Sequence, residues 1–215
     1  LKDFNADIIG VGCMFTMTHV SLKNVCKYVS KFKLPISIGG VHVTNDCFNV
    51  IEEMPFVNIA FLKESEISFP NFIKYINGEE KFENIGQFII NYNNEKILFF
   101  NTLTPTAEDL NVIPAYHLLD VGNLSKFGTM GNFYGFKNKN TKFATCLSNR
   151  GCRARCTFCS VRNFNGVSVR QRSVESVLDE LEILNKDHGI EHIVWLDDDL
   201  LKDHKRAIEL FNGIV

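Results

Sequence analysis

The amino-acid sequence predicts an α/β fold, because apolar runs of strand length alternate along it with segments of helical periodicity. In the first 80 residues, apolar runs at 7–12, 35–40 and 56–62 each precede a segment whose apolar residues recur at helical spacing. Strands that alternate with helices in this way form a parallel sheet with right-handed crossovers. A second alternation of the same kind begins at residue 142 and runs into three closely spaced cysteines.

The first part of the chain is predicted to contain three strand and helix units. The expected elements are a strand at 7–12, a helix over 22–32, a strand at 35–40, a helix capped by Asn45, a strand at 56–62, and a helix over 69–76 that ends at Gly78. Asparagine is a common N-cap, and glycine commonly ends a helix. Two β-rich runs within 87–100 flank Asn93-Asn94, which tolerate the positive φ of a tight turn, so a hairpin is expected there.

The pattern of strand and helix returns after a stretch at 104–140 that is first punctuated by Pro and then rich in Gly, Asn and Lys. This stretch predicts a linker. The elements expected after it are a strand at 142–148, a helix that Ser173 caps and Gly189 ends, a strand at 192–196, and the start of a helix at Ala207. They predict the opening of an α/β barrel or open sheet, in which loops at the carboxyl ends of strands carry the site. We therefore expect three regions, 1–80, 81–140 and 141–215.

Composition and charge narrow the class of protein. The 215 residues are 45% hydrophobic with a formal net charge of −2, which does not favour bulk binding to nucleic acid. No apolar run approaches the roughly 20 residues of a membrane-spanning helix, and no leader pattern opens the chain, so a cytoplasmic location without membrane attachment is expected. Seven cysteines in that setting favour reduced thiols and metal ligation over disulfides. A start without Met and an end within a helical pattern predict a fragment.

Cys152, Cys156 and Cys159 form a compact CxxxCxxC group after a predicted strand. Structural zinc sites use four ligands, so zinc would need a fourth ligand such as Cys146 or a distant His. Ferredoxin spacing adds a fourth cysteine nearby, commonly followed by Pro, and no cysteine follows Cys159. Three thiolates suit an iron–sulfur cubane with one iron open to a small molecule.

The segment around these cysteines is strongly basic. The first 149 residues contain no arginine, and the segment 150–172 contains no Asp or Glu. The arginines of the segment are Arg150, Arg153, Arg155, Arg162, Arg170 and Arg172. They predict either a solvated basic loop or a positive setting for an anionic group such as a thiolate-bound cluster.

The segments SNRGCRARCTFCSV, RQRSVESVLDELEIL and IVWLDDDLL resemble the radical S-adenosylmethionine (SAM) superfamily, in the branch with an N-terminal cobalamin-binding domain. The cluster ligands that the resemblance implies are Cys152, Cys156 and Cys159. They would hold a 4Fe-4S cluster whose fourth iron binds SAM. The resemblance also implies that Phe158 packs near the adenine of SAM and that Asp197 and Asp198 lie near its methionyl amine.

The segments ADIIGVGCMFT, GGVHVT and IPAYHLL resemble the cobalamin-binding domain and the link after it. The resemblance implies a Rossmann-like domain truncated at its N-terminus, followed by the first βα units of a radical SAM partial TIM barrel. It implies cofactor contacts from Thr16, Gly39, Gly40 and His42. The Asp-x-His-x-x-Gly motif that supplies an axial His in some cobalamin proteins is absent, and Lys63–Glu66 stands where the family has Gly-Glu-Gly-Glu.

The resemblance implies an enzyme that uses a 4Fe-4S cluster to cleave SAM reductively, with cobalamin-dependent methyl transfer to an unactivated carbon as the leading reaction. They imply an electron donor such as flavodoxin or ferredoxin. The substrate, a small molecule or a peptide, and the catalytic residues are not predicted. Two alternatives stay open: a radical SAM enzyme whose cobalamin domain has lost its cofactor, and a non-catalytic metal-binding module. The fragment by itself is expected to be inactive.

Overall fold

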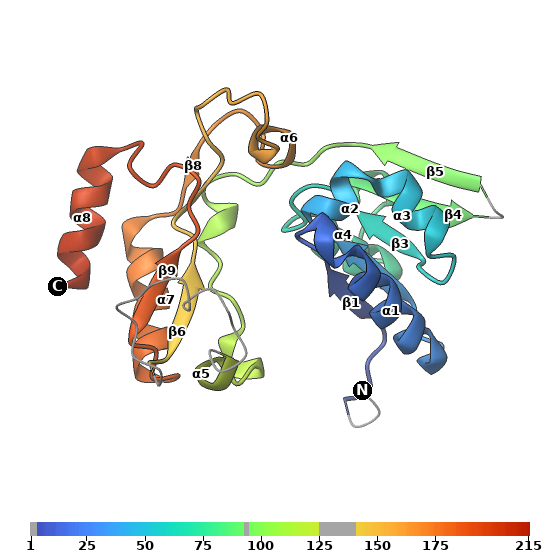
Figure 1. Ribbon diagram of the computed structural model, residues 1–215, viewed down its shortest axis with the longest axis horizontal. Coiled ribbons are helices and arrows are strands. Elements are labelled where there is room, and N and C mark those ends of the chain that lie inside the picture. Colours follow the sequence, from blue (N-terminus) through green and yellow to red (C-terminus); the bar gives the residue numbers. More distant parts are fainter. Residues whose placement is uncertain (1–3, 93–94, 125–140) are drawn as a thin grey trace. The chain divides into compact units, whose positions relative to one another are not determined.

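A computed structural model describes residues 4–92, 95–124 and 141–215 of the chain. The chain divides into two compact units, Leu1–Pro105 and Thr106–Val215. Both units combine strands with helices, so the predicted α/β class is confirmed (Figure 1). The division near residue 105 falls inside the region that the sequence assigned to a hairpin and a linker, 81–140.

The first unit is built on a five-stranded sheet with the strand order β1-β2-β3-β4-β5. The strands are β1 (Ile9–Gly12), β2 (Ile36–Gly39), β3 (Ile59–Phe61), β4 (Gln87–Tyr92) and β5 (Glu95–Phe100). The first three strands are parallel, and β4 and β5 are antiparallel, with β4 paired to β3. The predicted hairpin therefore extends the sheet of the first unit. Its predicted turn at Asn93-Asn94 lies outside the described residues.

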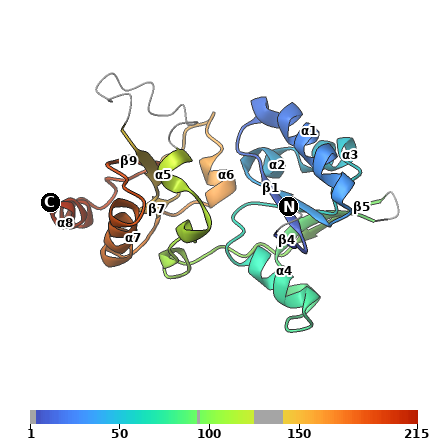
Figure 2. The same ribbon diagram turned by 90° about the horizontal axis from the view of Figure 1, so that it is seen from below.

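Helices cover both faces of this sheet (Figure 2). α1 (His19–Val29), α2 (Val41–Asn45) and α3 (Cys47–Glu53) lie on one face, and α4 (Ser68–Ile76) lies on the other. The side chains of β3 alternate between the two cores, as the pleat requires. Ala60 packs with the cluster under α1 to α3, whereas Ile59 and Phe61 pack with Phe69 and Phe72 of α4. Short 3-10 turns occur at Thr16–Thr18 (η1), Ser30–Phe32 (η2) and Phe82–Asn84 (η3).

The predicted cap at Asn45 is wrong. Asn45 is the last residue of α2, and α3 begins after Asp46, whose side chain makes no capping hydrogen bond. The amide of Asp46 donates to the carbonyl of His42, and the amide of Val50 donates to the carbonyl of Asp46. Helical periodicity therefore continues across the break and hides it from the sequence pattern. The predicted end of α4 is confirmed, because Gly78 follows it with a φ of +76°.

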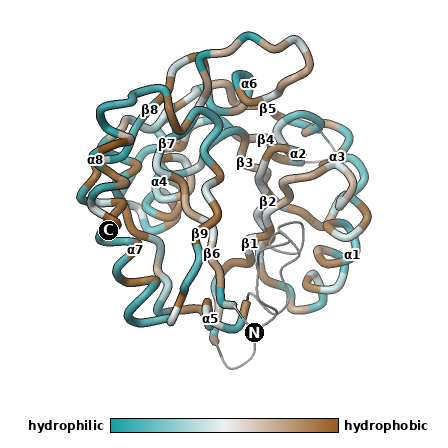
Figure 3. The backbone as a smooth tube through the Cα atoms, turned by 60° about the vertical axis from the view of Figure 1, so that its left-hand side comes forward, coloured by the Kyte–Doolittle hydropathy of each residue, from teal (hydrophilic) through white to brown (hydrophobic). Residues whose placement is uncertain are grey.

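The second unit contains a parallel pair of strands, β6 (Phe143–Cys146) and β9 (His192–Trp195). Helices α7 (Val174–Lys186) and α8 (His204–Ile214) pack on this pair through a core that contains Cys146, Val177 and Leu210. Both helices alternate between hydrophobic and hydrophilic residues along their length (Figure 3). The other elements are η4 (Asp109–Asn111), η5 (Tyr116–Leu118), α5 (Val121–Leu124), β7 (Asn149–Arg150), α6 (Val161–Asn165) and β8 (Arg170–Gln171), of which β7 and β8 form an antiparallel pair.

The ends of α7 follow the signals seen in the sequence. The hydroxyl oxygen of Ser173 accepts a hydrogen bond from the amide of Ser176 at 3.1 Å, which confirms the predicted N-cap. Gly189 has a φ of +65°, as expected for a glycine after a helix. Residues 125–140 of the predicted linker lie outside the described residues. No helix in the described ranges has the length and apolar character needed to cross a membrane.

Candidate functional site

The cysteine loop, defined here as residues 151–169, leaves and re-enters the second unit through the β7 and β8 pair. Gly151 begins this loop with a φ of +90°, and a Cβ atom at this position would lie 2.2 Å from the carbonyl oxygen of Ser168. Only glycine permits so close an approach of two backbone segments. The two ends of the loop therefore run side by side, and the loop begins a few residues after the carboxyl end of β6.

All three cysteines of the loop are free thiols, with Cys152 half-buried and Cys156 and Cys159 exposed. The amide of Ala154 donates to the sulfur of Cys152 at 3.4 Å. Within the described residues, no group of three or more His, Cys, Asp or Glu side chains is gathered closely enough to hold a metal ion. The donor set fits a cluster that takes three thiolates, because three accessible thiols share one loop. Phe158, predicted to contact SAM, is 90% exposed.

The arginines around the loop do not all face it. Arg153 forms an ion pair with Asp199, with 3.0 Å between Nε and Oδ2, and remains largely exposed. Arg162 donates to the carbonyl of Ala154 within the loop at 3.3 Å. Arg172, by contrast, is buried and paired with Glu180 of α7. The positive setting around the thiols stays a prediction, because Arg153 is paired with Asp199 and Arg172 is paired with Glu180 inside the unit.

The acidic pair after β9 is tied to the cysteine loop. The carboxylate of Asp197 accepts hydrogen bonds from the amide of Ser148 at 3.0 Å, from its hydroxyl at 2.8 Å, and from the amide of Asn149 at 2.5 Å. Asp198 accepts from the side-chain amide of Asn165 at 3.2 Å. Desolvation raises the pKa of the Asp198 carboxyl, and its hydrogen bond from Asn165 opposes this effect. The structure therefore brings both predicted carboxylates to the base of the loop.

In the first unit, the predicted cofactor residues gather at the carboxyl ends of β1 and β2. Gly40 has a φ of +110°, and a Cβ atom on it would lie 2.4 Å from the carbonyl oxygen of Cys13. Gly39 has ordinary contacts, and Thr16 is exposed in η1 after β1. Parallel sheets bind ligands at this edge, where a bare backbone lets a flat group approach. His42 lies in α2, directly after the glycine pair.

His42 is buried and hydrogen-bonded to a second histidine, His19 of α1. The Nε2 atom of His42 lies 2.9 Å from the Nδ1 atom of His19, and the Nε2 atom of His19 lies 3.3 Å from a carboxylate oxygen of Glu53. Lys23 also donates to Glu53, at 2.8 Å. Burial and then the neighbouring His19 lower the pKa of His42. The Nε2 atom of His42 is thus already engaged in a hydrogen bond within the protein.

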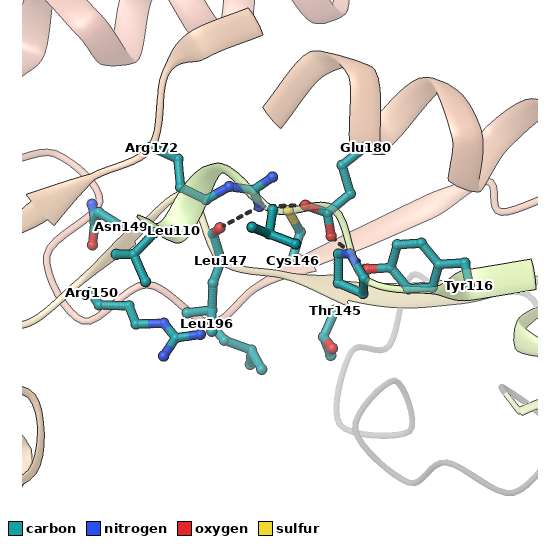
Figure 4. Close-up of a pocket in the computed structure, with 12 residues that line it drawn as sticks. Leu110, Tyr116, Thr145, Cys146, Leu147, Asn149, Arg150, Arg172, Glu180 and Leu196 are labelled. Atoms are coloured by element: carbon teal, nitrogen blue, oxygen red, sulfur yellow. Dashed lines mark hydrogen bonds and ion pairs between the residues drawn. The ribbon is translucent and has the colours of Figure 1, made fainter. Parts of the chain in front are cut away.

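A cluster of buried polar side chains lies near the end of β6 in the second unit (Figure 4). Arg172 and Glu180 point toward one another, and the hydroxyl of Tyr116 donates to Glu180 at 2.5 Å. Arg172 also donates to the carbonyl of Leu147 at 3.0 Å. Burial, followed by the bond to Glu180, raises the pKa of the Tyr116 phenol. These residues line a cavity of about 230 Å³ that also contacts Cys146.

Cys146 has the environment of a core residue. It is 3% exposed and packs with Val177 and Leu210, and burial raises the pKa of its thiol to about 12. The structure gives no support to Cys146 as a fourth ligand beside the loop cysteines.

Sequence reasoning missed three residues that organise these sites: Tyr116, Glu180 and Arg206. Each of them has a partner that is distant in the chain, with 64 residues between Tyr116 and Glu180 and 58 between Arg206 and Ser148. The one local signal was Glu180 itself, an acidic residue that stands four positions after Ser176 on the α7 face toward the core.

Comparisons with known proteins agree with the fold and with the motifs. No family model matches the chain. The chain is 24% identical over 236 residues to the cytidylyl-2-hydroxyethylphosphonate methyltransferase of Streptomyces wedmorensis, covering 99% of this chain and 43% of that protein. It is thus similar to a methyltransferase along nearly its full length, and spans less than half of that relative.

Two solved structures share the fold. One is the cobalamin-dependent SAM radical enzyme OxsB with aqua-cobalamin and SAM bound, with a TM-score of 0.75 and 23% identity over 99% of this chain and 29% of that one. The other is the radical SAM methyltransferase TsrM of Kitasatospora setae with cobalamin and a [4Fe-4S] cluster bound, with a TM-score of 0.70 and 18% identity over 97% of this chain and 40% of that one. The resemblance inferred from the motifs is confirmed: the chain has the fold of the corresponding part of cobalamin-dependent radical SAM enzymes.

Proposed function

We propose that this chain is part of a radical SAM enzyme that binds a 4Fe-4S cluster through Cys152, Cys156 and Cys159. The observation that carries the proposal is the placement of three free, accessible thiols on one loop at the carboxyl side of β6. The relatives are named as a methyltransferase and as cobalamin-dependent radical SAM enzymes, which supports the same reading.

Cobalamin is the second group that we propose for this protein, at the carboxyl edge of the first sheet. Gly39 and Gly40 have no side chains that would keep a flat group away from the backbone there, and Thr16 has an exposed hydroxyl. His42 is proposed to stabilise this edge of the sheet rather than to bind the cofactor, because its Nε2 atom is already hydrogen-bonded to His19, which in turn contacts Glu53. When bound, the cluster would supply the electron for reductive cleavage of SAM, and cobalamin would supply the methyl group for transfer.

Within this scheme the chain's own residues bind and orient. Phe158, which is exposed on the loop, is proposed to pack against the adenine of SAM. Asp198 is proposed to accept a hydrogen bond from the methionyl amine of SAM. Asp197 is proposed to act mainly by holding the backbone at Ser148 and Asn149. A cytoplasmic location, a small-molecule or peptide substrate and a flavodoxin or ferredoxin as electron donor stay predictions from the sequence.

The test is anaerobic reconstitution with iron and sulfide, followed by iron analysis and electron paramagnetic resonance of the reduced protein with and without SAM. We expect cluster formation and a signal that changes when SAM is added. Cys156→Ala is expected to lose the cluster. The matched control is Cys47→Ala, which removes a buried thiol of the first unit and is expected to retain iron.

Two results would contradict this proposal. A cluster signal that does not respond to SAM would remove the SAM-dependent reaction. Stoichiometric zinc without iron after anaerobic purification would favour a metal-binding module instead. The cobalamin site has its own measurement, because bound hydroxocobalamin shifts its absorption spectrum, and no shift on titration would leave a radical SAM enzyme with a domain that has lost its cofactor.

A further inference from the structure

Arg206, in the first turn of α8, bridges the two ends of the cysteine loop. Its guanidinium donates to the carbonyl of Ser148 at 3.1 Å, before the loop, and to the carbonyl of Arg172 at 2.7 and 3.1 Å, after it. It also lies 3.4 Å from the hydroxyl of Ser148. One side chain thus binds backbone atoms 24 positions apart in the sequence, on both sides of the three cysteines.

Further hydrogen bonds hold the same two backbone segments. The amide of Arg172 donates to the carbonyl of Ser148 at 3.0 Å, which closes the loop at its base. Asp197 accepts from the amides of Ser148 and Asn149, so the donors of the incoming segment are also bound. At the base of the loop, backbone amides therefore donate to the carboxylate of Asp197, and backbone carbonyls accept from the guanidinium of Arg206.

Arg206 stands on a firmly held element. Asp203 caps α8 by accepting from the amide of Arg206 at 3.0 Å, and Ala207 and Leu210 are buried in the core. A guanidinium is a planar fork whose donors reach two acceptors at once, whereas the ammonium of lysine is a point charge on a flexible stem. The geometry of this contact therefore needs arginine and not merely a positive charge.

We propose that Arg206 is a positioning residue that clamps the base of the cysteine loop. The clamp fixes the two ends of the loop, and so the positions from which its thiols bind an iron–sulfur cluster. The role in cluster binding rests on the proposed function, whereas the hydrogen bonds of the clamp exist in the protein without the cluster. The hydrogen bonds of the Arg206 guanidinium go to Ser148 and Arg172, so its effect on the cluster would pass through the loop base.

The experiment is amide hydrogen exchange of the cluster-free protein, followed by iron analysis after reconstitution. Arg206→Gln is expected to speed exchange at the amide of Arg172 by about tenfold or more, because the variant loses hydrogen bonds from a charged donor. Amides of β9 are expected to exchange as in the unchanged protein. After reconstitution the variant is expected to hold less iron per chain.

Two further variants make the result specific. Lys205→Gln removes the same charge from the same turn of α8, at an exposed side chain, and is expected to match the unchanged protein. Arg206→Lys keeps the charge but not the fork, and is expected to exchange faster at Arg172 than Lys205→Gln does. Equal exchange in Arg206→Lys and the unchanged protein would overturn the need for a fork.

Equal exchange at Arg172 in Arg206→Gln and Lys205→Gln would overturn the clamp itself, and so would loss of protection that spreads through β9. A protein that binds no iron in any form, yet shows the local exchange pattern, would refute the proposed cluster and leave the clamp standing. The two ideas therefore fail through different measurements.

Discussion

The buried pair of Arg172 and Glu180 gives the sharpest prediction about stability. Both side chains are nearly out of water, at 8% and 3% exposed, and the carboxylate also accepts from Tyr116. Glu180→Gln keeps the shape and one acceptor but removes the negative charge. The guanidinium of Arg172 would then be buried without a counterion, which typically costs about 3–5 kcal/mol when one partner of such a pair is lost.

That loss is large for a unit of this size. A domain of about 110 residues has a free energy of unfolding on the order of 5–15 kcal/mol, so Glu180→Gln would remove about a fifth of it or more. A loss of about 3 kcal/mol corresponds to a decrease in Tm of roughly 10–20 °C for the second unit. The chain's single tryptophan, Trp195 in β9, reports on this unit, so urea and thermal unfolding followed by its fluorescence measure the effect.

Two substitutions calibrate the measurement. Glu182→Gln, on the same helix, breaks an exposed pair with Lys186 and is expected to cost at most about 0.5 kcal/mol. Tyr116→Phe removes one hydrogen bond and leaves the ion pair, so about 1 kcal/mol is expected. If Glu180→Gln costs no more than Glu182→Gln, the reasoning from the buried charge is refuted.

Three further predictions follow from local geometry. Gly40→Ala is expected to destabilise the first unit by about 1–3 kcal/mol in urea unfolding, because its Cβ would meet the carbonyl of Cys13 at a positive φ. In the native cluster-free protein, an alkylating reagent is expected to modify Cys156 rapidly and Cys146 very slowly, as read by mass spectrometry, because burial raises the pKa of the Cys146 thiol to about 12. The pKa of His42 is lowered in the folded protein, so the unfolded chain binds a proton more readily at this residue. The stability of the first unit is therefore expected to fall as the pH falls below about 6.5. The variant His42→Gln is expected to reduce this pH dependence.

Each of these has an outcome that would contradict it. A Gly40→Ala protein as stable as the unchanged one would mean that the backbone at Cys13 moves aside freely. Equal labelling of Cys146 and Cys156 would mean that β6 opens as readily as the loop. A His42→Gln protein that still loses stability between pH 7 and 5.5 to the same extent would place the titrating group elsewhere.

Much of the secondary structure could be read from the sequence because its signals are local. The strands of the first unit and β6 and β9 of the second lie where apolar runs or the hairpin pattern predicted them, whereas β7 and β8 were not predicted. Ser173 and Gly78 act at the helix ends as expected. The exception, Asn45, arose because helical hydrogen bonds continue across the break at Asp46. The CxxxCxxC spacing was likewise legible in one segment, and it was enough to reveal the resemblance that the fold comparison confirms.

The sequence by itself therefore determined the α/β class, the longer strands and helices in their order, and the loop that carries three thiols, since each depends on residues a few positions apart. Only the tertiary structure decided that Arg172 is buried against Glu180, that His42 is engaged by His19, and that Asp197 and Arg206 bind the base of the cysteine loop. Periodicity reports which face of an element is buried, but it carries no information on which distant polar groups meet there. That choice is made by packing, when buried donors and acceptors must find partners across the fold.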